Sequence, residues 1–323
     1  MDNLQKKIFD KIRSENTTAS NSTVNMYASN ISKIVRDMDI KENEFTINDL
    51  LDHDKILNYL KTNDYTLNTI KNKISSIVAY LVACKVDKKL IEKYIDDIDS
   101  FSAKIERDKK KMVKTKREEV NWMTLQEMKD YMNNEFKLLP KSLKTYHDFY
   151  MWMKYLSGEF HLIYPMRNEL ADLKIFSHGE YKKVDEGSRY NYLILNQKSK
   201  TMKMILNKYK TYKVYGQKEI IISDPFLIEM FTIYYKALKL FFKEHVELDF
   251  NNFFLFHKDG SHFTRNDFTK LLNSTFYKSG KRISTSLIRK IVVSELYPVS
   301  KIRDMAYIMA HSPSEAVHSY IKS

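Results

Sequence analysis

The sequence holds a single cysteine, Cys84, among 323 residues. One cysteine excludes an internal disulfide, which rules out the small secreted classes that are stabilised by disulfides. No long apolar run follows Met1, and a signal peptide or a membrane-spanning helix would need one. We therefore expect an intracellular protein with no membrane partner.

Glycine and proline are also scarce, with 6 and 5 residues. This excludes an all-β fold with many turns and leaves no glycine-rich loop of the kind that cradles nucleotide phosphates, so an ATP-driven enzyme is not expected. His257, His262 and His318 do not make a metal-binding pattern with Cys84, and we interpret them as surface or hydrogen-bonded side chains. No metal and no cofactor are expected.

Positive charge is what the chain has in excess. The 54 Lys and Arg residues outnumber the 41 Asp and Glu residues, giving a net charge of +13. Such a balance attracts polyanions at long range and through counterion release. Nucleic acid is the leading candidate partner, and a merely basic protein is the alternative.

The apolar residues are spaced mostly as in helices. They recur at steps of three and four over 24–38 and 67–81, with shorter helical pieces at 56–60 and 91–98. Residues 1–103 are therefore predicted to form a small helical domain. The segment 104–121 is rich in Lys and Arg and predicts a basic linker, either a solvated tether or a strap that contacts DNA.

Residues 122–323 are predicted to form a second, α+β domain. Thr124 and Glu127 have the spacing of a capping box that begins a helix. Short strand-like runs at 192–195, 202–206 and 220–222 predict a small antiparallel sheet. The fold class is therefore mainly α with a small antiparallel β-sheet. Further helices are predicted near 142–158, 165–173, 225–245, 285–297, 299–310 and 314–322.

Two arginines of the second domain stand out. Arg167 follows Pro165 at the predicted start of a helix, where its donors could join free backbone N–H groups around a phosphate. Arg289 lies in the largely apolar helix "ISTSLIRKIVVSELY". An arginine is costly to bury there unless it meets an anion, either a ligand or an internal carboxylate.

A basic segment lies between these two arginines. From Arg189 to Lys218 there are eight Lys and Arg residues and no Asp or Glu, a composition typical of a nucleic-acid face. Within it "KYKTYKVYG" interleaves Lys with Tyr. The tyrosines could stack on bases or could be ordinary strand residues.

Together with the closing segment "MAHSPSEAVHSYIKS", these motifs resemble the catalytic domain of the tyrosine recombinases, the phage-integrase and XerD-like family. That family is built around an Arg, a Lys, a His-x-x-Arg box, a later His or Trp, and a Tyr nine residues beyond. The resemblance extends to residues 1–103, which look like the helical core-binding domain of the family. It implies the catalytic residues Arg167, Lys210, Arg289, His311 and Tyr320.

Lys210 is our choice for the lysine of the family's hairpin, and Lys213 is the near alternative. Two positions depart from the family pattern. Ser286 stands where the box has His, and a hydroxyl can hydrogen-bond a phosphate but cannot act as an acid or base near neutral pH. Lys290 stands where many members have a second His, and it is a candidate substitute donor.

The resemblance implies a DNA recombinase or integrase in which Tyr320 forms a 3′-phosphotyrosyl link, acting as a tetramer on double-stranded DNA. The Pro-x-Arg-Asn form of the first arginine box is similar to integrases of virophages and large DNA viruses, which implies integration of a viral or mobile element at DNA in the nucleus, cytoplasm or viral factory. The alternatives are a type IB topoisomerase and an inactive DNA-binding relative, the latter motivated by Ser286.

Overall fold

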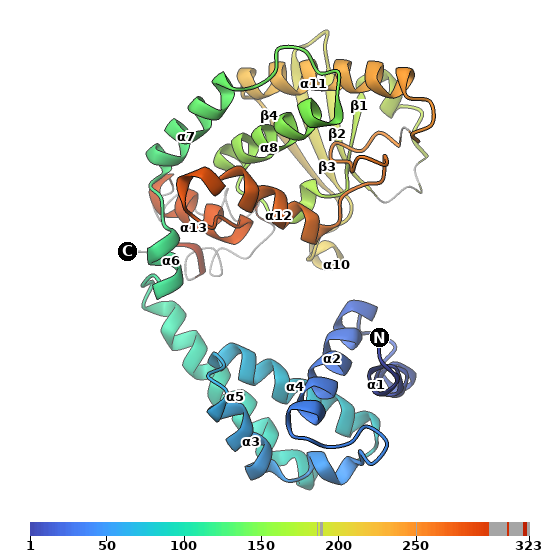
Figure 1. Ribbon diagram of the computed structural model, residues 1–323, viewed down its shortest axis with the longest axis vertical. Helices are drawn as coiled ribbons and strands as arrows, with labels where there is room; N and C mark the ends of the chain where they lie inside the picture. Colours follow the sequence, from blue (N-terminus) through green and yellow to red (C-terminus); the bar gives the residue numbers. More distant parts are fainter. Residues whose placement is uncertain (186, 188–189, 250, 297–308, 310–318, 322–323) are drawn as a thin grey trace. The chain divides into compact units, whose positions relative to one another are not determined.

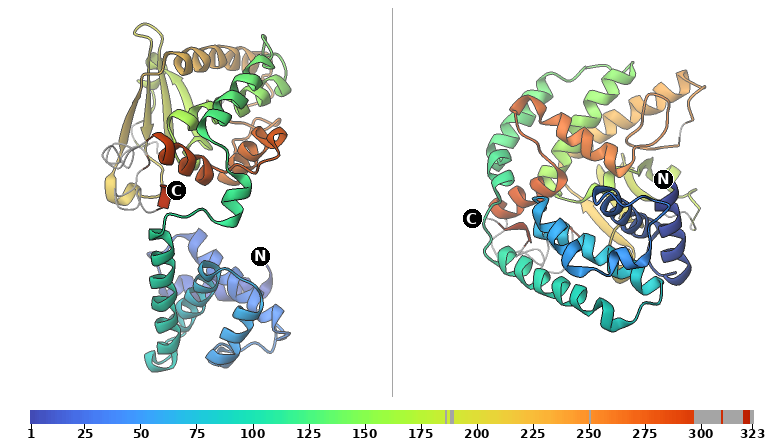
Figure 2. Two further views of the ribbon diagram at one scale, coloured as in Figure 1. Left: turned by 90° about the vertical axis from the view of Figure 1, so that its left-hand side faces the viewer. Right: turned by 60° about the horizontal axis from the view of Figure 1, so that its bottom comes forward.

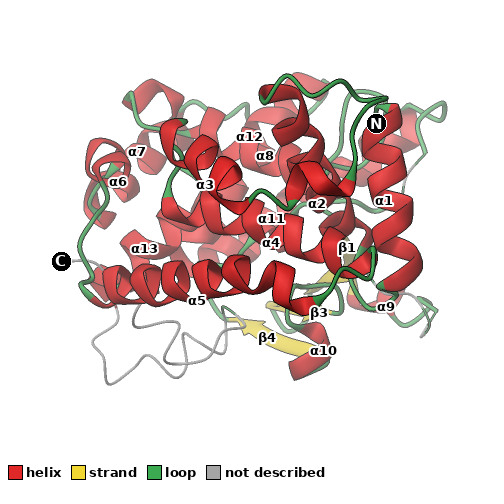
Figure 3. Cartoon of the chain, turned by 90° about the horizontal axis from the view of Figure 1, so that it is seen from below, coloured by secondary structure: helices red, strands yellow, loops and turns green. Residues whose placement is uncertain are grey.

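The computed structural model describes residues 1–185, 187, 190–249, 251–296, 309 and 319–321. The chain divides into two compact units, Met1–Lys111 and Met112–Ser323. They run from blue to teal and from green to red in Figure 1. Most described residues are helical, and the named strands form one small sheet (Figure 3). This confirms the expected mainly α class. None of the described helices is both long and apolar enough to cross a membrane.

The first unit is a helical bundle with its own core. Its apolar stripes meet around side chains such as Ile31, Ile74 and Tyr94, and the Tyr94 hydroxyl donates to the Leu50 carbonyl at 2.9 Å. The helices predicted over 24–38 and 67–81 are confirmed as α2 and α4. The elements are α1 (Asn3–Glu15), α2 (Asn21–Asp37), η1 (Ile47–Leu50), α3 (His53–Thr62), α4 (Leu67–Ala83) and α5 (Lys88–Lys110).

Helix α5 is longer than the helical piece predicted over 91–98. It continues to Lys110 and so includes the first part of the basic segment 104–121. Helix α6 (Lys116–Asn121) takes up the last part, behind a capping box of Thr115 and Glu118. Burial of Ile91 and Tyr94 anchors α5. Lys, Arg and Glu then prolong it because these long side chains favour helix without needing burial.

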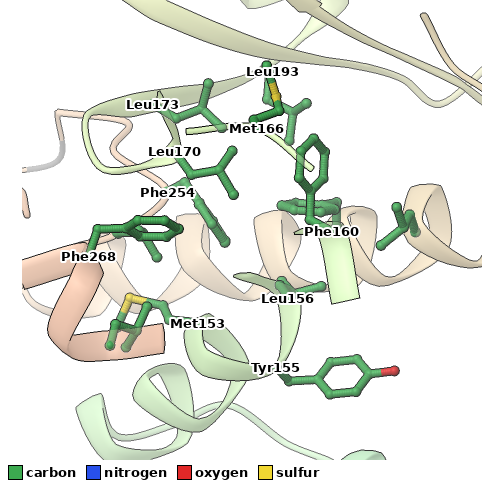
Figure 4. Close-up of a cluster of buried hydrophobic side chains, with 14 of the residues drawn as sticks. Met153, Tyr155, Leu156, Phe160, Met166, Leu170, Leu173, Leu193, Phe254 and Phe268 are labelled. Atoms are coloured by element: carbon green, nitrogen blue, oxygen red, sulfur yellow. The ribbon is translucent and has the colours of Figure 1, made fainter. Parts of the chain in front are cut away.

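Helix α8 (Tyr146–Ile163) is the central element of the second unit. It packs against α7 (Leu125–Lys137), α11 (Pro225–Glu244), α12 (Arg265–Thr275) and α13 (Thr285–Leu296), as Figures 1 and 2 show. Its Met153, Leu156 and Phe160 side chains lie in a cluster with Phe254 and Phe268 (Figure 4). The helices predicted over 225–245 and 285–297 are confirmed. Those predicted at 299–310 and 314–322 fall almost entirely outside the described residues.

The sheet has four strands in the order β1-β2-β3-β4. Strands β2, β3 and β4 are antiparallel neighbours, as expected, but β1 pairs with β2 in parallel. One face packs on the main core, and the other is covered around Tyr192 by Tyr181 and Val184. The elements are β1 (Leu173–Ser177), α9 (His178–Tyr181), β2 (Asn191–Asn196), β3 (Thr201–Leu206), α10 (Tyr212–Tyr215) and β4 (Lys218–Ile222).

The helix predicted over 165–173 is wrong. The chain instead makes one 3-10 turn, η2 (Asn168–Leu170), and enters β1. Leu170 and Leu173 have helical spacing, but Leu173 and Ile175 are buried on alternate positions of a strand. The connection from β1 to β2 through α9 is about a dozen residues long, which is the shortest length that can join two parallel strands. It therefore allows β1 to pair with β2 in parallel.

Asn191 fastens one end of this sheet. Its side chain is fully buried and makes four hydrogen bonds to backbone groups. Its Oδ1 accepts from the N–H groups of Asn207 at 3.0 Å and Lys208 at 2.8 Å. Its Nδ2 donates to the carbonyls of Glu169 at 3.2 Å and Lys208 at 3.1 Å. One amide therefore joins the turn before β1 to the segment after β3.

Replacement of Asn191 by Ala should lower the free energy of unfolding of the second unit by about 2–4 kcal/mol, because buried backbone groups lose their partners. Urea unfolding followed by tryptophan fluorescence measures this, since Trp122 and Trp152 both lie in that unit. The exposed Asn251 provides the control Asn251→Ala, expected within about 0.5 kcal/mol of wild type. Equal losses in the two variants would contradict the role of Asn191.

Candidate active site

A buried histidine, His161, contacts the turn that carries Arg167. The His161 ring is fully buried in α8. Its Nδ1 lies 2.8 Å from the Ser157 carbonyl oxygen and its Nε2 lies 3.2 Å from that of Arg167. Burial lowers the pKa of His161 to about 4, so the ring is neutral near pH 7. The half-buried Arg167 itself has an extended backbone and directly precedes η2.

Asn168, the next residue, ties this turn to two helices. Its Nδ2 donates to the Arg265 carbonyl at 3.1 Å and to Thr269 Oγ1 at 3.0 Å, both on α12. Its Oδ1 accepts from Thr285 Oγ1 at 2.7 Å, at the start of α13. The turn of Arg167 and the helix of Arg289 are therefore fixed to each other by one side chain.

Arg289 is buried, with 4% of its surface exposed. Its Nε donates to the Thr285 carbonyl at 3.3 Å and its Nη2 donates to Ser286 Oγ at 3.1 Å. Burial lowers the pKa of Arg289, and the charge of Arg167 lowers it further. Two cationic groups thus act on one another at this site, a repulsion that an anion bound between them would relieve.

Tyr320 completes the cluster. The Arg289 guanidinium carbon lies 4.9 Å from the centre of the Tyr320 ring, within the range of a cation–π contact. Ser294 Oγ, on the same helix as Arg289, donates to the Tyr320 carbonyl at 3.0 Å. The structure therefore brings together Arg167, Arg289 and Tyr320. His311 lies outside the described residues.

Glu169 is a buried acid beside this cluster. It is 5% exposed, and its Oε2 has no hydrogen-bond partner among the described residues. Burial raises the pKa of Glu169, opposed by the charges of Arg265, Arg289 and Arg167. Its carboxyl group lies close enough to Arg289 to act on it electrostatically, so it contributes to the field in which that guanidinium is buried.

Ser286 and Lys290 lie on the same helix but meet different surroundings. Ser286 is exposed and lines a cavity of about 240 Å³ together with Arg117 and Arg282. Neither of these arginines forms an ion pair with a described residue. The Lys290 amine, in contrast, forms a close ion pair with Glu118 of α6. Ser286 therefore lines an opening that holds two arginines and Glu118, whereas Lys290 joins α13 to α6 through its ion pair with that same Glu118.

Lys210 and Lys213 are placed by the pairing of the strands. Leu173 pairs with Asn191, and Leu206 pairs with Lys218, so the segment 207–217 lies at the same end of the sheet as the Arg167 turn. Lys210 and Lys213 are exposed in that segment, the second of them on α10 (Figure 1). Lys210 is therefore not in the β2–β3 turn. It lies in the β3–β4 connection, at the end of the sheet where the site is.

The lysines of the basic segment, from Lys198 to Lys218, do not form a single face. Lys198 and Lys200 occupy the β2–β3 turn at the opposite end of the sheet. Lys203 pairs with Glu219 at 3.1 Å and Lys208 pairs with Asp172 at 2.5 Å, while Lys218 is 4% exposed. This division could not be predicted from the sequence, because strand direction decides which end of the sheet each lysine reaches.

Sequence reasoning missed the residues that position the site: His161, Asn168 and Asn191. Each is a polar residue next to apolar ones, which is a weak signal on its own. Among the described residues, no group of three or more His, Cys, Asp and Glu side chains is arranged to hold a metal ion.

No protein-family model and no curated protein matches the chain. Among solved structures, the chain is similar to XerA recombinase, at 11% identity and a TM-score of 0.39, over 99% of this chain and 94% of that one. It is also similar to XerH site-specific recombinase bound to difH substrate, a pre-cleavage complex, at 13% identity and a TM-score of 0.47, over 98% and 92%. Identities and TM-scores this low carry no argument about function, so a functional assignment depends on the chain's own residues.

The buried His161 should make the second unit lose stability in acid. The unfolded chain binds the proton near pH 6.5 and the folded chain only near pH 4. The free energy of unfolding should therefore fall as the pH drops between these values, by up to about 3 kcal/mol. Urea unfolding at several pH values measures the slope. The variant His161→Gln should remove most of it, and an unchanged slope would contradict this origin.

Proposed function

We propose that this protein is a site-specific DNA recombinase that cuts and rejoins DNA through a 3′-phosphotyrosyl intermediate. The proposal is supported chiefly by one observation: the buried Arg289 contacts the Tyr320 ring and lies within electrostatic range of the half-buried Arg167, whose turn is fixed to the same helix. Two arginines and a phenol are the groups needed to bind a phosphodiester and attack it.

In the proposed reaction, the Tyr320 oxygen attacks the phosphorus, and the phenol gives its proton to a water molecule. The bond to the 5′-oxygen breaks as the phosphotyrosyl bond forms, and Lys210 supplies a proton to the leaving oxygen. Arg167 and Arg289 hold the non-bridging oxygens while negative charge develops on them. His311 would be a further donor. Attack by a 5′-hydroxyl of another strand reverses the step, so the reaction consumes no co-reactant.

Lys210 has the access that the proposed proton donor needs. It is exposed and lies at the end of the sheet next to the Arg167 turn. Lys213 shares that position and stays the alternative. Lys208 is a weaker candidate because Asp172 binds its amine. Ser286 would donate a hydrogen bond to the phosphate from beside Arg289.

The wider role that we propose is integration of a viral or mobile element, carried out by a tetramer bound to double-stranded DNA. In that assembly residues 1–103 would bind DNA as a core-binding domain, residues 104–121 would connect the domains, and residues 122–323 would carry out catalysis. The basic composition of 104–121 supports contact with the DNA backbone.

Tyr320→Phe should abolish a covalent protein–DNA product. The test incubates the protein in EDTA with pooled duplexes that carry a nick near the candidate cleavage position, so that the cut fragment diffuses away. A denaturing gel then detects the adduct. The control Tyr277→Phe removes a hydroxyl from a side chain that is 79% exposed and should keep the wild-type yield. DNA binding without any adduct in wild type would instead support an inactive DNA-binding relative, and relaxation of supercoils without strand exchange would support a topoisomerase.

The variants Ser286→Ala and Lys290→Met should distinguish the roles of the two residues that stand where the family has histidines. Loss of the Ser286 hydroxyl should slow adduct formation by about tenfold or more, because one donor to the developing charge is removed. Lys290→Met should mainly lower stability, since the Lys290 amine binds Glu118. Single-turnover rates at saturating DNA, measured where both variants are folded, decide this. A rate for Lys290→Met as low as that for Tyr320→Phe would show that Lys290 takes part in the chemistry.

A further inference from the structure

Helix α11 carries a row of lysines on the side that faces away from the core. Lys236, Lys239 and Lys243 are exposed and follow one another at steps of three and four residues, so they lie on one face of the helix. Leu240 lies among them and is 60% exposed, whereas the opposite face is buried around Phe231. We call these four exposed residues the basic stripe. It presents three cations around one apolar side chain.

The basic stripe forms one wall of a cavity of about 860 Å³. The other walls come from α9 and from the β2–β3 turn, which adds Lys198, and no described Asp or Glu lines the cavity. Lys239 Nζ lies 2.5 Å from Glu180 Oε1. Lys198, Lys236 and Lys243 form no ion pair with a described residue. Because like charges at this helical spacing repel one another, the cavity favours an acidic occupant.

The position of this cavity argues against DNA as the occupant. The cavity lies at the end of the sheet where β2 turns into β3 and Asn196 pairs with Thr201. The Arg167 turn lies at the other end, where Leu173 pairs with Asn191. A strand of this length spans about 20 Å. A duplex held at the candidate active site would therefore meet the other end of the sheet.

The chain itself carries a matching acidic face, on helix α5 of the first unit. Glu92, Asp96 and Asp99 are exposed and lie at steps of four and three residues, on one side of that helix. None of the three forms an ion pair with a described residue. Ile95 lies beside them, partly buried against the core of the first unit. This acidic face therefore presents three anions next to one apolar side chain.

The two patterns match when the helices run antiparallel. The steps on α11 are three and then four residues, and the steps on α5, read backwards, are also three and then four. Since every residue of a helix rises by the same amount, each cation then has an anion at its own height, and Leu240 lies opposite Ile95. Packed helices cross at an angle, so the contact covers about two turns of each. The three pairs are Lys236 with Asp99, Lys239 with Asp96, and Lys243 with Glu92.

We infer that the acidic face of α5 in one copy of this protein docks on the basic stripe of α11 in a second copy. The contact joins the first unit of one copy to the second unit of another. It goes beyond the proposed function and does not rest on it, because the two faces are complementary whether or not the protein cleaves DNA. Each copy carries both faces, so further copies can join in the same way.

Charge reversal tests this contact. Self-association of protein free of nucleic acid is measured by sedimentation velocity over a range of protein concentrations, at about 50 mM salt, where surface charges are weakly screened. The double variant Lys236→Glu, Lys243→Glu should associate about tenfold more weakly or less, because like charges then face each other. The control Lys129→Glu, Lys258→Glu changes the net charge equally at two exposed lysines elsewhere and should associate as wild type does. A wild-type protein that stays monomeric throughout would overturn the inference.

Restoring the opposite charges gives the decisive result. The second double variant, Glu92→Lys, Asp99→Lys, should also associate weakly on its own. A mixture of the two double variants should recover association to within about threefold of wild type, because each reversed face then meets a complementary one. No recovery in the mixture would overturn the inference.

Binding to a fluorescent duplex identifies the main competing occupant. If reversal of Lys236 and Lys243 weakened duplex binding and left self-association unchanged, the basic stripe would be a DNA contact and the inference would be overturned. None of these measurements involves cleavage. Recovered association in a protein that forms no Tyr320 adduct would therefore support the docking contact while overturning the proposed recombinase chemistry.

Discussion

The burial of one positive charge constrains the second unit more than any other feature. Arg289 lies in a helix whose neighbours Leu287, Ile288 and Val292 are also buried, and taking a guanidinium out of water is expensive unless polar groups surround it. Part of this free-energy cost is offset by the contacts of Arg289 with the Thr285 carbonyl, the Ser286 hydroxyl and the Tyr320 ring. Arg167 adds to the cost through repulsion. The arrangement is one that a bound phosphate would stabilise.

Two asparagines make that arrangement possible from parts of the chain that are far apart in sequence. Asn168 joins the turn of Arg167 to α12 and α13. Asn191 joins the same turn to the connection between β3 and β4. Since a side-chain amide both donates and accepts hydrogen bonds, each asparagine can join two segments of the chain at once. The positions of the proposed arginines and of the proposed proton donor therefore depend on hydrogen bonds between elements. The apolar core around α8 stabilises these elements.

The sequence predicted what depends on periodicity. Apolar steps of three and four predicted α4, α11 and α13, because burial of one helix face leaves a regular pattern. Strand β1 was missed because five residues carry too few repeats to separate a strand from a helix. The position of Lys210 could not be predicted either, since it follows from the parallel pairing of β1 with β2. Asn168 and Asn191 leave no periodic signal, because a hydrogen bond needs one residue at one place. The catalytic roles of Arg167, Lys210, Arg289, His311 and Tyr320 stay predictions.

The contact between Tyr320 and Arg289 has a kinetic consequence for the proposed reaction. With the ring over the guanidinium and only 7% of the tyrosine exposed, the proposed nucleophile lies against the group that would bind its target. A cation–π contact is worth about 0.5–2 kcal/mol, little enough for an incoming phosphate to replace it. Binding of the phosphate to Arg289 and release of the Tyr320 ring from it would then be one event, so the phenol would become free to react only when a phosphate is already bound.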